Sequence, residues 1–386
     1  MKTQNNARRQ PTFLLLIMTL GLSACIPLTP SLPTPIPVTP ETNSIPSWLE
    51  IYFTNPAAPQ SANFEGGPDE NLAAAIDKAR LSVDVAANSL NLASIRDAII
   101  RAYHRGVVVH MVMESDNMGG QDVQTIQEVG IPIKGEPTEG LMLNNFVVID
   151  GNEVWTGSMN FTTESAYADN NNLLHIHSKV IADEFMVEFK KLFEGDLAET
   201  EAGMATPNPS LNIEGTDLEV YFLPEEASAA RITELILGAT KSISFLSPEF
   251  FGAVIDGAIG GVGPQVTVEG VVDASMADYG VPAPGTRLDM RADGNISGSM
   301  HESVIIIDQR IVIIGSYNFS NEVNEAVHGV NSSPIHSNVI MLFNTGIAAV
   351  FNNEFRGIYN HALTKWPPPN LPTSSLSGET TPPPAP

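Results

Sequence analysis

The residues best suited to chemistry lie in one stretch of the C-terminal half. His301 precedes an apolar run, Val304 to Ile307, and a Gly-Ser-Tyr-Asn sequence at 315–318 follows a second apolar run, Ile311 to Ile314. A histidine can act as a nucleophile or exchange protons, and serine and asparagine side chains can donate hydrogen bonds to an anion. This order of residues therefore suggests a polar site with one histidine beside small hydrogen-bonding groups.

The two apolar runs predict the element that positions this site. They are rich in β-branched residues and are separated by a short polar segment, which is typical of a buried β-hairpin. We place the turn at Gln309 and Arg310, so that His301 and Ser316 lie side by side at the open end of the hairpin. Asp308 lies at the turn, where a carboxylate is suited to bind backbone amides.

The stretch resembles the signature of the phospholipase D superfamily, His-x-Lys-x4-Asp followed by Gly-Ser-x-Asn. The residues that match are His301, Asp308, Gly315, Ser316 and Asn318. Ser303 stands where the family has a lysine. The resemblance therefore covers the frame of the motif but not its cation.

The same pattern occurs a second time, earlier in the chain. The residues that match there are Asp150, Gly157, Ser158 and Asn160. Leu143 replaces the histidine and Asn145 replaces the lysine. Between them, the two copies thus retain one of two histidines and neither lysine.

The resemblance implies a reaction and a set of site residues. In the family, one histidine attacks phosphorus, the other protonates the leaving group, and lysines and asparagines bind the phosphoryl oxygens without a metal. It implies His301 as the candidate nucleophile, with Asp308 and Asp150 as the other catalytic-motif residues. The implied phosphate-binding residues are Ser158, Asn160, Ser316 and Asn318. No cofactor and no metal are expected.

The missing groups weigh against this reaction. Loss of an acid–base partner costs a factor of about 10² to 10⁴ in rate, and loss of an oxyanion donor costs about 10² or more. We therefore interpret the chain as a phospholipase D-like binding or scaffold protein with degenerate motifs and little or no phosphodiesterase activity. The alternative is a phosphodiesterase that acts on phospholipid or another exported phosphodiester through a His301 phosphohistidine. In either case Leu143 is expected near His301, in a polar and uncharged cleft.

An internal repeat predicts the fold. Ile51-Tyr52-Phe53 recurs as Val220-Tyr221-Phe222, and Glu188-Phe189 recurs as Glu354-Phe355, in the same order as the two motifs. Helices and strands alternate along each copy, which predicts an α/β unit with helices on both sheet faces. In the first copy we expect helices at 71–80, 92–104 and 183–193 and strands at 82–87 and 107–113. In the family, two such units pack about a pseudo-twofold axis. The region 260–298 follows the family pattern least.

Composition completes the division of the chain. We assign 1–25 to a lipoprotein signal peptide, 26–46 to a Pro/Thr-rich linker, 47–196 to the first unit, 197–216 to a linker, 217–362 to the second unit and 363–386 to a Pro-rich disordered tail. The net charge of −25 argues against a nucleic-acid partner. The same acidity would also serve solubility alone.

The N-terminus predicts a membrane anchor. Lys2, Arg8 and Arg9 precede the apolar run from Phe13 to Leu22, which is too short to span a bilayer. The Leu-Ser-Ala-Cys sequence that ends at Cys25 resembles the bacterial lipobox, which implies a lipidated cysteine. We therefore expect an extracytoplasmic, membrane-anchored bacterial lipoprotein, with a phosphodiester or phospholipid as a possible ligand.

Other polar residues receive a structural interpretation. His175 and His177 would share one strand face, and without a third ligand in the sequence we expect a solvated face rather than a metal site. Residues 169–172 are interpreted as a polar loop, although the family often has an acidic residue there that orients the opposite histidine. His328 and His336 are assigned no role.

Overall fold

The structure is a computed structural model that describes residues 44–136, 140–194, 209–224, 228–279, 288–295, 298–317, 319 and 335–362. Cys25, the expected signal peptide, His328, Asn318 and the tail at 363–386 lie outside the described residues.

The first unit is built on a seven-stranded sheet in the order β1-β8-β7-β6-β2-β3-β4. Its strands are β1 (Leu49–Phe53), β2 (Ser82–Ala87), β3 (Val108–Met113), β4 (Ile133–Gly135), β6 (Asn145–Ile149), β7 (Glu153–Gly157) and β8 (Asn172–His177). Its helices are α1 (Pro68–Lys78), α2 (Ala93–His104), α3 (Gln121–Val129), α4 (Thr163–Tyr167) and α5 (Lys179–Glu194). The predicted helices and strands of this copy are present, and α3 was not predicted.

The second unit repeats this order. Its sheet runs β9-β10-β16-β15-β14-β11-β12-β13, and β5 (Leu141–Met142) of the first unit pairs with β16. Its strands are β9 (Ser210–Ile213), β10 (Thr216–Leu223), β11 (Ser242–Ser247), β12 (Thr267–Val272), β13 (Leu288–Ala292), β14 (Val304–Ile307), β15 (Ile311–Gly315) and β16 (Ile335–Phe343). Its helices are α7 (Ser228–Leu237), α8 (Ala253–Gly261) and α10 (Thr345–His361). The seven strands β10 to β13 of this path match the first sheet one for one, which confirms the predicted α/β repeat.

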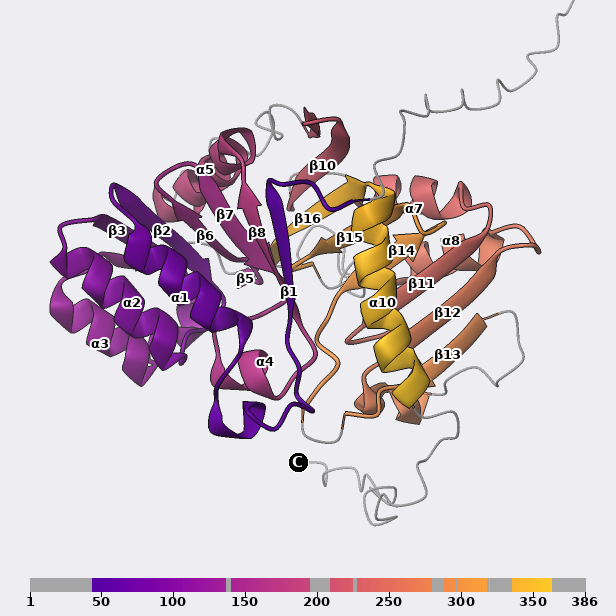
Figure 1. Cartoon of the computed structure of the whole chain (residues 1–386), viewed down its shortest axis with the longest axis horizontal. Helices are drawn as coiled ribbons and strands as arrows, with labels where there is room; N and C mark the ends of the chain where they lie inside the picture. The colour runs from indigo at the N-terminus through magenta and orange to yellow at the C-terminus, as the bar shows by residue number, and fades with distance from the viewer. Residues whose placement is uncertain are drawn as a thin grey trace, which may run out of the picture. The chain divides into compact units, whose positions relative to one another are not determined.

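Helices cover both faces of each sheet (Figure 1). In the first unit α1, α2 and α3 pack on one face and α5 on the other. In the second unit α7 and α8 occupy one face and α10 the other. The expected layers are therefore present in both copies.

The two units share one apolar core. Phe185 of α5 contacts Phe222 of β10 with ring centroids 5.0 Å apart, and Phe53 of β1 contacts Phe351 of α10 at 5.3 Å. The same cluster of buried residues includes Phe146 from the first unit. Burial of each large apolar side chain contributes about 1.5–3 kcal/mol. The stability of each unit therefore depends on the other.

The predicted turn of the second hairpin is wrong by one residue. Asp308 and Gln309 have positive φ angles of 53° and 55°, and the Arg310 amide donates to the Ile307 carbonyl at 3.0 Å. These values define a type I′ turn, whose twist matches that of the strands. The turn is thus centred on Asp308-Gln309 and not on Gln309-Arg310.

Two further expectations need correction. The proposed linker at 197–216 contains β9, which pairs with β10. The region 260–298, which the repeat did not explain, contains β12 and β13 of the second sheet. Short strands with few apolar residues, such as β9, leave little trace in a hydrophobicity pattern.

Candidate active site between the two units

The segments before the two hairpins each bind the backbone of the other unit. The His301 amide donates to the Asn170 carbonyl at 3.1 Å, and the Leu143 amide donates to the His336 carbonyl at 2.7 Å. Asp150 and Asp308 occupy the same turn position, which makes Leu143 and His301 equivalent residues seven positions before them. The exchange of hydrogen bonds is therefore reciprocal.

His301 is oriented by Asn171 of the first unit. Its Nδ1 lies 2.9 Å from Asn171 Oδ1, while Asn171 Nδ2 donates to the Ser165 carbonyl at 3.0 Å. Because the Ser165 contact fixes the amide orientation, Nδ1 of His301 must carry the proton. Burial lowers the pKa of His301. The ring is therefore held neutral with its lone pair on Nε2, which is the form that attacks an electrophile.

The contact to Asn171 corrects the interpretation of 169–172. This segment is not an ordinary polar loop, because it orients the one remaining motif histidine. An asparagine here can accept a hydrogen bond from the Nδ1–H group but carries no charge. The sequence did show that residues 169–172 occupy the place of the family's orienting residue. The interpretation failed because it considered only the missing histidine at 143, whereas the histidine that Asn171 contacts is His301.

The two motif serines face different partners. Ser158 is buried, donates to Asn171 Oδ1 at 2.9 Å and accepts from the Asn172 amide at 3.1 Å. Phosphate binding by Ser158 would require the first of these bonds to break. Ser316 accepts from the amide and the Nδ2 of Asn338, each at 3.1 Å. Its hydroxyl proton has no acceptor among the described residues.

Carboxylates surround His301. Asp169 accepts from the Ser299 amide and Asp273 accepts from the Met300 amide, each at 2.8 Å. Both charges act on His301 and oppose the lowering of its pKa by burial. Burial raises the pKa of Asp169. The expectation of an uncharged cleft is therefore wrong, since the charged groups near His301 are acidic.

A second pair of contacts, which the sequence did not predict, repeats across the two units. Asn172 Nδ2 donates to Glu302 Oε1 at 3.0 Å, and Asn338 Nδ2 donates to Asn144 Oδ1 at 2.9 Å. Burial, with repulsion from Glu354 as the smaller cause, raises the pKa of Glu302 to about 8. Glu302 is therefore protonated at neutral pH. The sequence contained one signal for this pair of contacts, because Asn144 and Glu302 occupy equivalent positions beside the two motifs.

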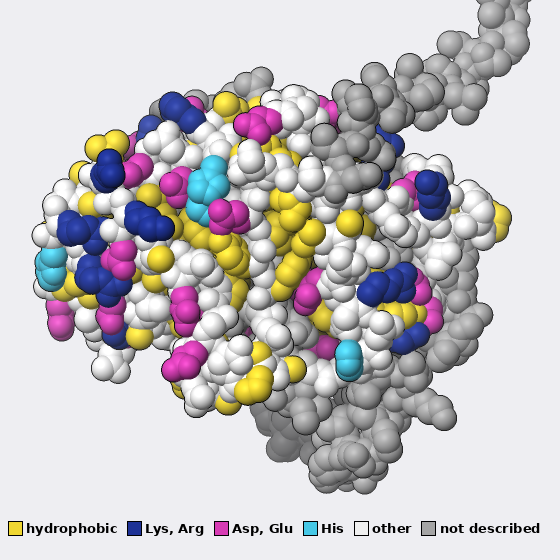
Figure 2. All heavy atoms as spheres, in the orientation of Figure 1, with side chains coloured by type: hydrophobic (Ala, Val, Ile, Leu, Met, Phe, Trp, Pro, Cys, Tyr) yellow, Lys and Arg dark blue, Asp and Glu magenta, His cyan; other side chains and the backbone are white. Residues whose placement is uncertain are grey.

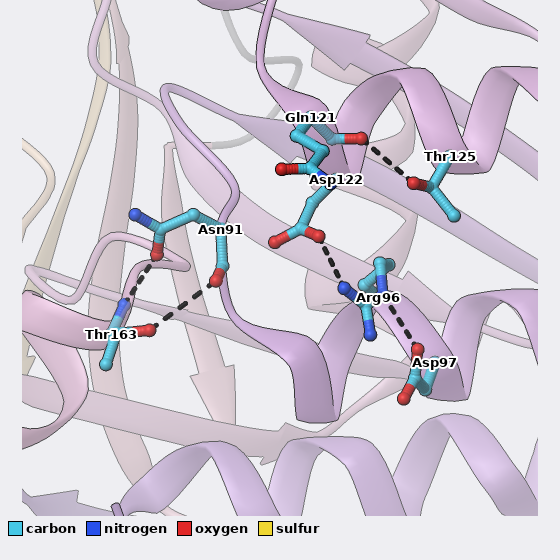
Figure 3. Close-up of polar contacts among 7 residues, drawn as sticks. All are labelled: Asn91, Arg96, Asp97, Gln121, Asp122, Thr125 and Thr163. Carbon is cyan, nitrogen blue, oxygen red and sulfur yellow. Dashed lines mark hydrogen bonds and ion pairs between the residues drawn. The ribbon is translucent and has the colours of Figure 1, made fainter.

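A short loop of the first unit fixes the segment that follows Ser158. The Thr163 amide donates to the Asn91 side chain at 2.8 Å, at the start of α4 (Figure 3). Nearby, Arg96 of α2 pairs with Asp122 of α3 and joins the two helices. These contacts attach the motif to the helical face of the sheet.

Comparison with known proteins identifies this arrangement. A family model described as a cardiolipin synthase, PLD-like domain matches residues 72–193, and one described as a scaffolding anchor of CK1 domain matches 282–364. Residues 72–193 are thus a phospholipase D-like domain.

The curated relatives are similar to part of the chain. Mitochondrial cardiolipin hydrolase of Xenopus tropicalis is 26% identical over 119 residues, which cover 30% of this chain and 57% of the relative. A phospholipase D of Rickettsia conorii is 28% identical over 142 residues, 36% of this chain and 66% of the relative. The chain thus spans about half the length of the first of these relatives.

Solved structures share the fold of both units. A phosphatidylserine synthase of Haemophilus influenzae aligns with a TM-score of 0.61 at 14% identity, covering 81% of this chain and 86% of that one. A polyphosphate kinase of Porphyromonas gingivalis aligns with a TM-score of 0.55 at 11% identity, covering 80% of this chain and 50% of that one. At these identities the likeness concerns the fold alone.

The phospholipase D lysine positions hold buried neutral side chains. Asn145 Nδ2 donates to Asn160 Oδ1 at 2.7 Å, and Asn145 Oδ1 accepts from the Asn88 amide at 3.1 Å. Ser303 is also buried. Asn160 Nδ2 makes no hydrogen bond within the described part of the chain, so it alone of these amides keeps donors for a ligand.

The two phospholipase D aspartates are structural. Asp150 accepts from the amides of residues 80–82, and Asp308 accepts from those of residues 240–242. Asp308 lies at the turn and His301 beyond the other end of β14, so the carboxylate does not contact the histidine. The prediction that both aspartates bind backbone amides at the hairpin turns is confirmed. Their assignment to the catalytic motif with His301 stays a prediction.

None of the helices that the structure describes combines the length and the apolar character that a bilayer crossing needs.

Proposed function

We propose that this protein is a phospholipase D-like binding or scaffold protein with little or no phosphodiesterase activity. The observation that carries the proposal is Leu143, which occupies the position equivalent to His301 and can neither accept nor donate a proton. A leaving alkoxide would therefore depart without a protein acid. That loss alone costs a factor of about 10² to 10⁴ in rate.

The charge of the site supports the proposal. Asn145 and Ser303 supply no cations, while Asp169 and Asp273 supply negative charge beside His301. Two unit charges 4 Å apart interact by about 4 kcal/mol at an effective dielectric constant of 20. The site thus lacks the lysines that would attract a phosphate and has aspartates that repel it. This charge weakens the binding of a phosphate dianion and favours a neutral or zwitterionic ligand over a highly charged one.

The family match to the second unit also supports a binding role. The model that covers 282–364 is named for a scaffolding anchor, and this range includes His301 and its hairpin. A polar site with amide groups, carboxylates and one histidine can bind a ligand without turning it over.

We place this activity at a bacterial membrane surface. Cys25 at the end of a signal-like leader would carry a lipid, and residues 26–46 would act as an extended spacer. A phospholipid or another exported phosphodiester is the ligand class that this location would offer.

A residual phosphodiesterase is the second candidate, favoured by the orientation of His301. Its Nε2 would form a bond to phosphorus while the bond to the leaving oxygen breaks, and the alkoxide would take its proton from water. A second water would then hydrolyse the phosphohistidine.

An activity assay separates the two candidates. We expect no turnover of bis(p-nitrophenyl) phosphate or phospholipid vesicles by the wild type, because general acid and cations are missing. The triple variant Leu143→His, Asn145→Lys, Ser303→Lys should gain weak turnover, and adding His301→Ala should remove it. Thermal unfolding of each variant controls for misfolding at these buried positions. Wild-type turnover that His301→Ala abolishes would overturn the proposal in favour of the phosphodiesterase.

A further inference from the structure

A cluster of histidines and glutamates lies on the first sheet, away from His301. Glu50 of β1 is directly opposite His175 of β8, and Glu153 of β7 is directly opposite His177. Because side chains alternate along strands, His175 and His177 point to the same face. In Figure 2 a group of histidine side chains lies between acidic side chains, over the region where Figure 1 places β1, β8 and β7.

The separations suit a metal ion. His175 Nδ1 and His177 Nε2 each lie 3.5 Å from an oxygen of Glu50, and the three ligand atoms lie within 4.8 Å of one another. Zinc bonds of about 2.0–2.1 Å in a tetrahedral site place ligand atoms roughly 3.4 Å apart. The Glu50 carboxylate is thus near this separation from both imidazoles, with Oε2 facing His175 and Oε1 facing His177.

The hydrogen bonds of His175 point its free lone pair into the cluster. Its Nε2 lies 2.9 Å from Glu153 Oε2, and a carboxylate only accepts, so this nitrogen carries the proton. Nδ1 of the neutral ring then faces the Glu50 carboxylate, to which Tyr52 also donates a hydrogen bond. A cation between these two acceptors would bind both of them. The contact from Glu153 is the carboxylate–histidine arrangement that supports metal-bound imidazoles.

We propose that Glu50, His175 and His177 form a binding site for a divalent transition metal such as Zn²⁺, with Glu153 as a positioning residue. The site offers three protein ligands, which leaves a fourth position for water. The imidazole ligands select Zn²⁺, Co²⁺, Ni²⁺ or Cu²⁺ over Mg²⁺ and Ca²⁺. The carboxylates of Glu50 and Glu153 balance the charge of the ion.

The structure also assigns the site a role in the fold. β1 is the edge strand of its sheet, and the metal would join it to β8. The interpretation of His175 and His177 as a solvated strand face is wrong for His175, which is buried against Trp155 with ring centroids 4.0 Å apart. The third ligand was invisible in the sequence because Glu50 lies more than a hundred positions away.

Calorimetry with Zn²⁺ tests the site on the full chain carrying Cys25→Ser, so that the only cysteine cannot compete. We expect one ion per chain, a higher thermal midpoint with Zn²⁺, and Co²⁺ absorption typical of four-coordinate geometry. His177→Ala and Glu50→Gln should each weaken binding at least about tenfold, and Glu153→Gln by about 10- to 100-fold. His104→Ala, at an exposed histidine on α2, should leave binding unchanged. No binding of Zn²⁺ by the wild type, or equal binding by wild type, His177→Ala and Glu50→Gln, would overturn the proposal.

Discussion

At the scale of single residues, one hydrogen bond decides what His301 can do. Asn171 binds the ring at Nδ1, but as a neutral acceptor it stabilises the imidazolium less than a carboxylate would. In the equivalent place, Leu143 makes no such bond, and the buried Ser337 hydroxyl has no hydrogen-bond partner among the described residues. The chain thus retains the histidine and its orienting residue in only one of two equivalent positions.

A carboxylate at position 171 should reverse the pKa shift of His301. In Asn171→Asp, we expect the pKa of His301 to rise from its lowered value, because an anion bonded to Nδ1 favours the charged ring. Titration of the imidazole by NMR measures this, with His104 as an internal reference. In Asn171→Ala the pKa should not rise. An unchanged pKa in Asn171→Asp would show that Asn171 is not the partner of His301.

Glu302 should make the protein less stable as the pH rises. Its folded pKa of about 8 lies above its ordinary value of 4.5, so the folded state holds the proton more tightly. Stability from this group is complete below pH 4.5 and is lost as pH rises towards 8, by up to about 1.4 kcal/mol per pH unit. Glu302→Gln should therefore gain stability relative to the wild type between pH 5 and pH 8 in urea unfolding. A constant difference across that range would contradict the buried proton.

At the scale of elements, the two hairpins owe their shape to their aspartates. Each has an aspartate at a positive φ in a type I′ turn, and each carboxylate binds three successive amides of the segment before the neighbouring strand, β2 or β11. The turn is thereby joined to a strand that is distant in sequence. This joint between the turn and the distant strand is a structural reason for the aspartate in both motifs of this chain.

Asp308→Asn tests that joint. Burial acts to raise the pKa of Asp308, but hydrogen bonds from Thr240, Ser242 and Lys241 outweigh it and leave the pKa lowered. Its stabilising effect is therefore present above the unfolded pKa and lost as pH falls through the folded value. Asparagine keeps the positive φ, so we expect a loss of about 1–2 kcal/mol at pH 7 that shrinks at pH 3.

Thr240→Val provides the control, because it removes only the hydroxyl bond to Asp308 and should cost less. Urea unfolding at both pH values measures the two variants. Equal losses at pH 3 and pH 7 would show that the charge of Asp308 is not responsible.

Prediction from sequence succeeded where the pattern was local. The β-branched runs predicted β14 and β15, and the alternation of helices and strands predicted β2, α2 and β3 almost to the residue. Contacts between the units could not be predicted from the sequence, because Asn171 contacts His301 only once the two sheets pack together. The acidic surroundings of His301 were missed for the same reason: Asp169 and Asp273 come from different units.

At the scale of the whole molecule, the two units form one cooperative body. The apolar cluster that contains Phe185, Phe222 and Phe351 crosses from one unit to the other. Neither unit can therefore change its site without a response in its partner. The expected lipid anchor would hold this body at a surface through residues 26–46.

Cys25→Ser tests the anchor. Without the thiol no lipid can be attached, so we expect the protein to move from the membrane fraction to the soluble fraction. Fractionation of cells that express the wild type or the variant, followed by carbonate washing, measures the distribution. Equal retention of both proteins on membranes would count against lipidation.

The reciprocal backbone bonds of Leu143 and His301 have a consequence for amide hydrogen exchange. Each of these two amide protons is covered by a carbonyl of the opposite unit. Their exchange with deuterium therefore requires the units to part locally, whereas amides inside one sheet exchange through opening of that sheet. The exchange rates of these two protons thus report how often the interface opens. Because the two residues occupy equivalent positions before the two hairpins, a difference between their rates measures how unequally the two sides of the interface open.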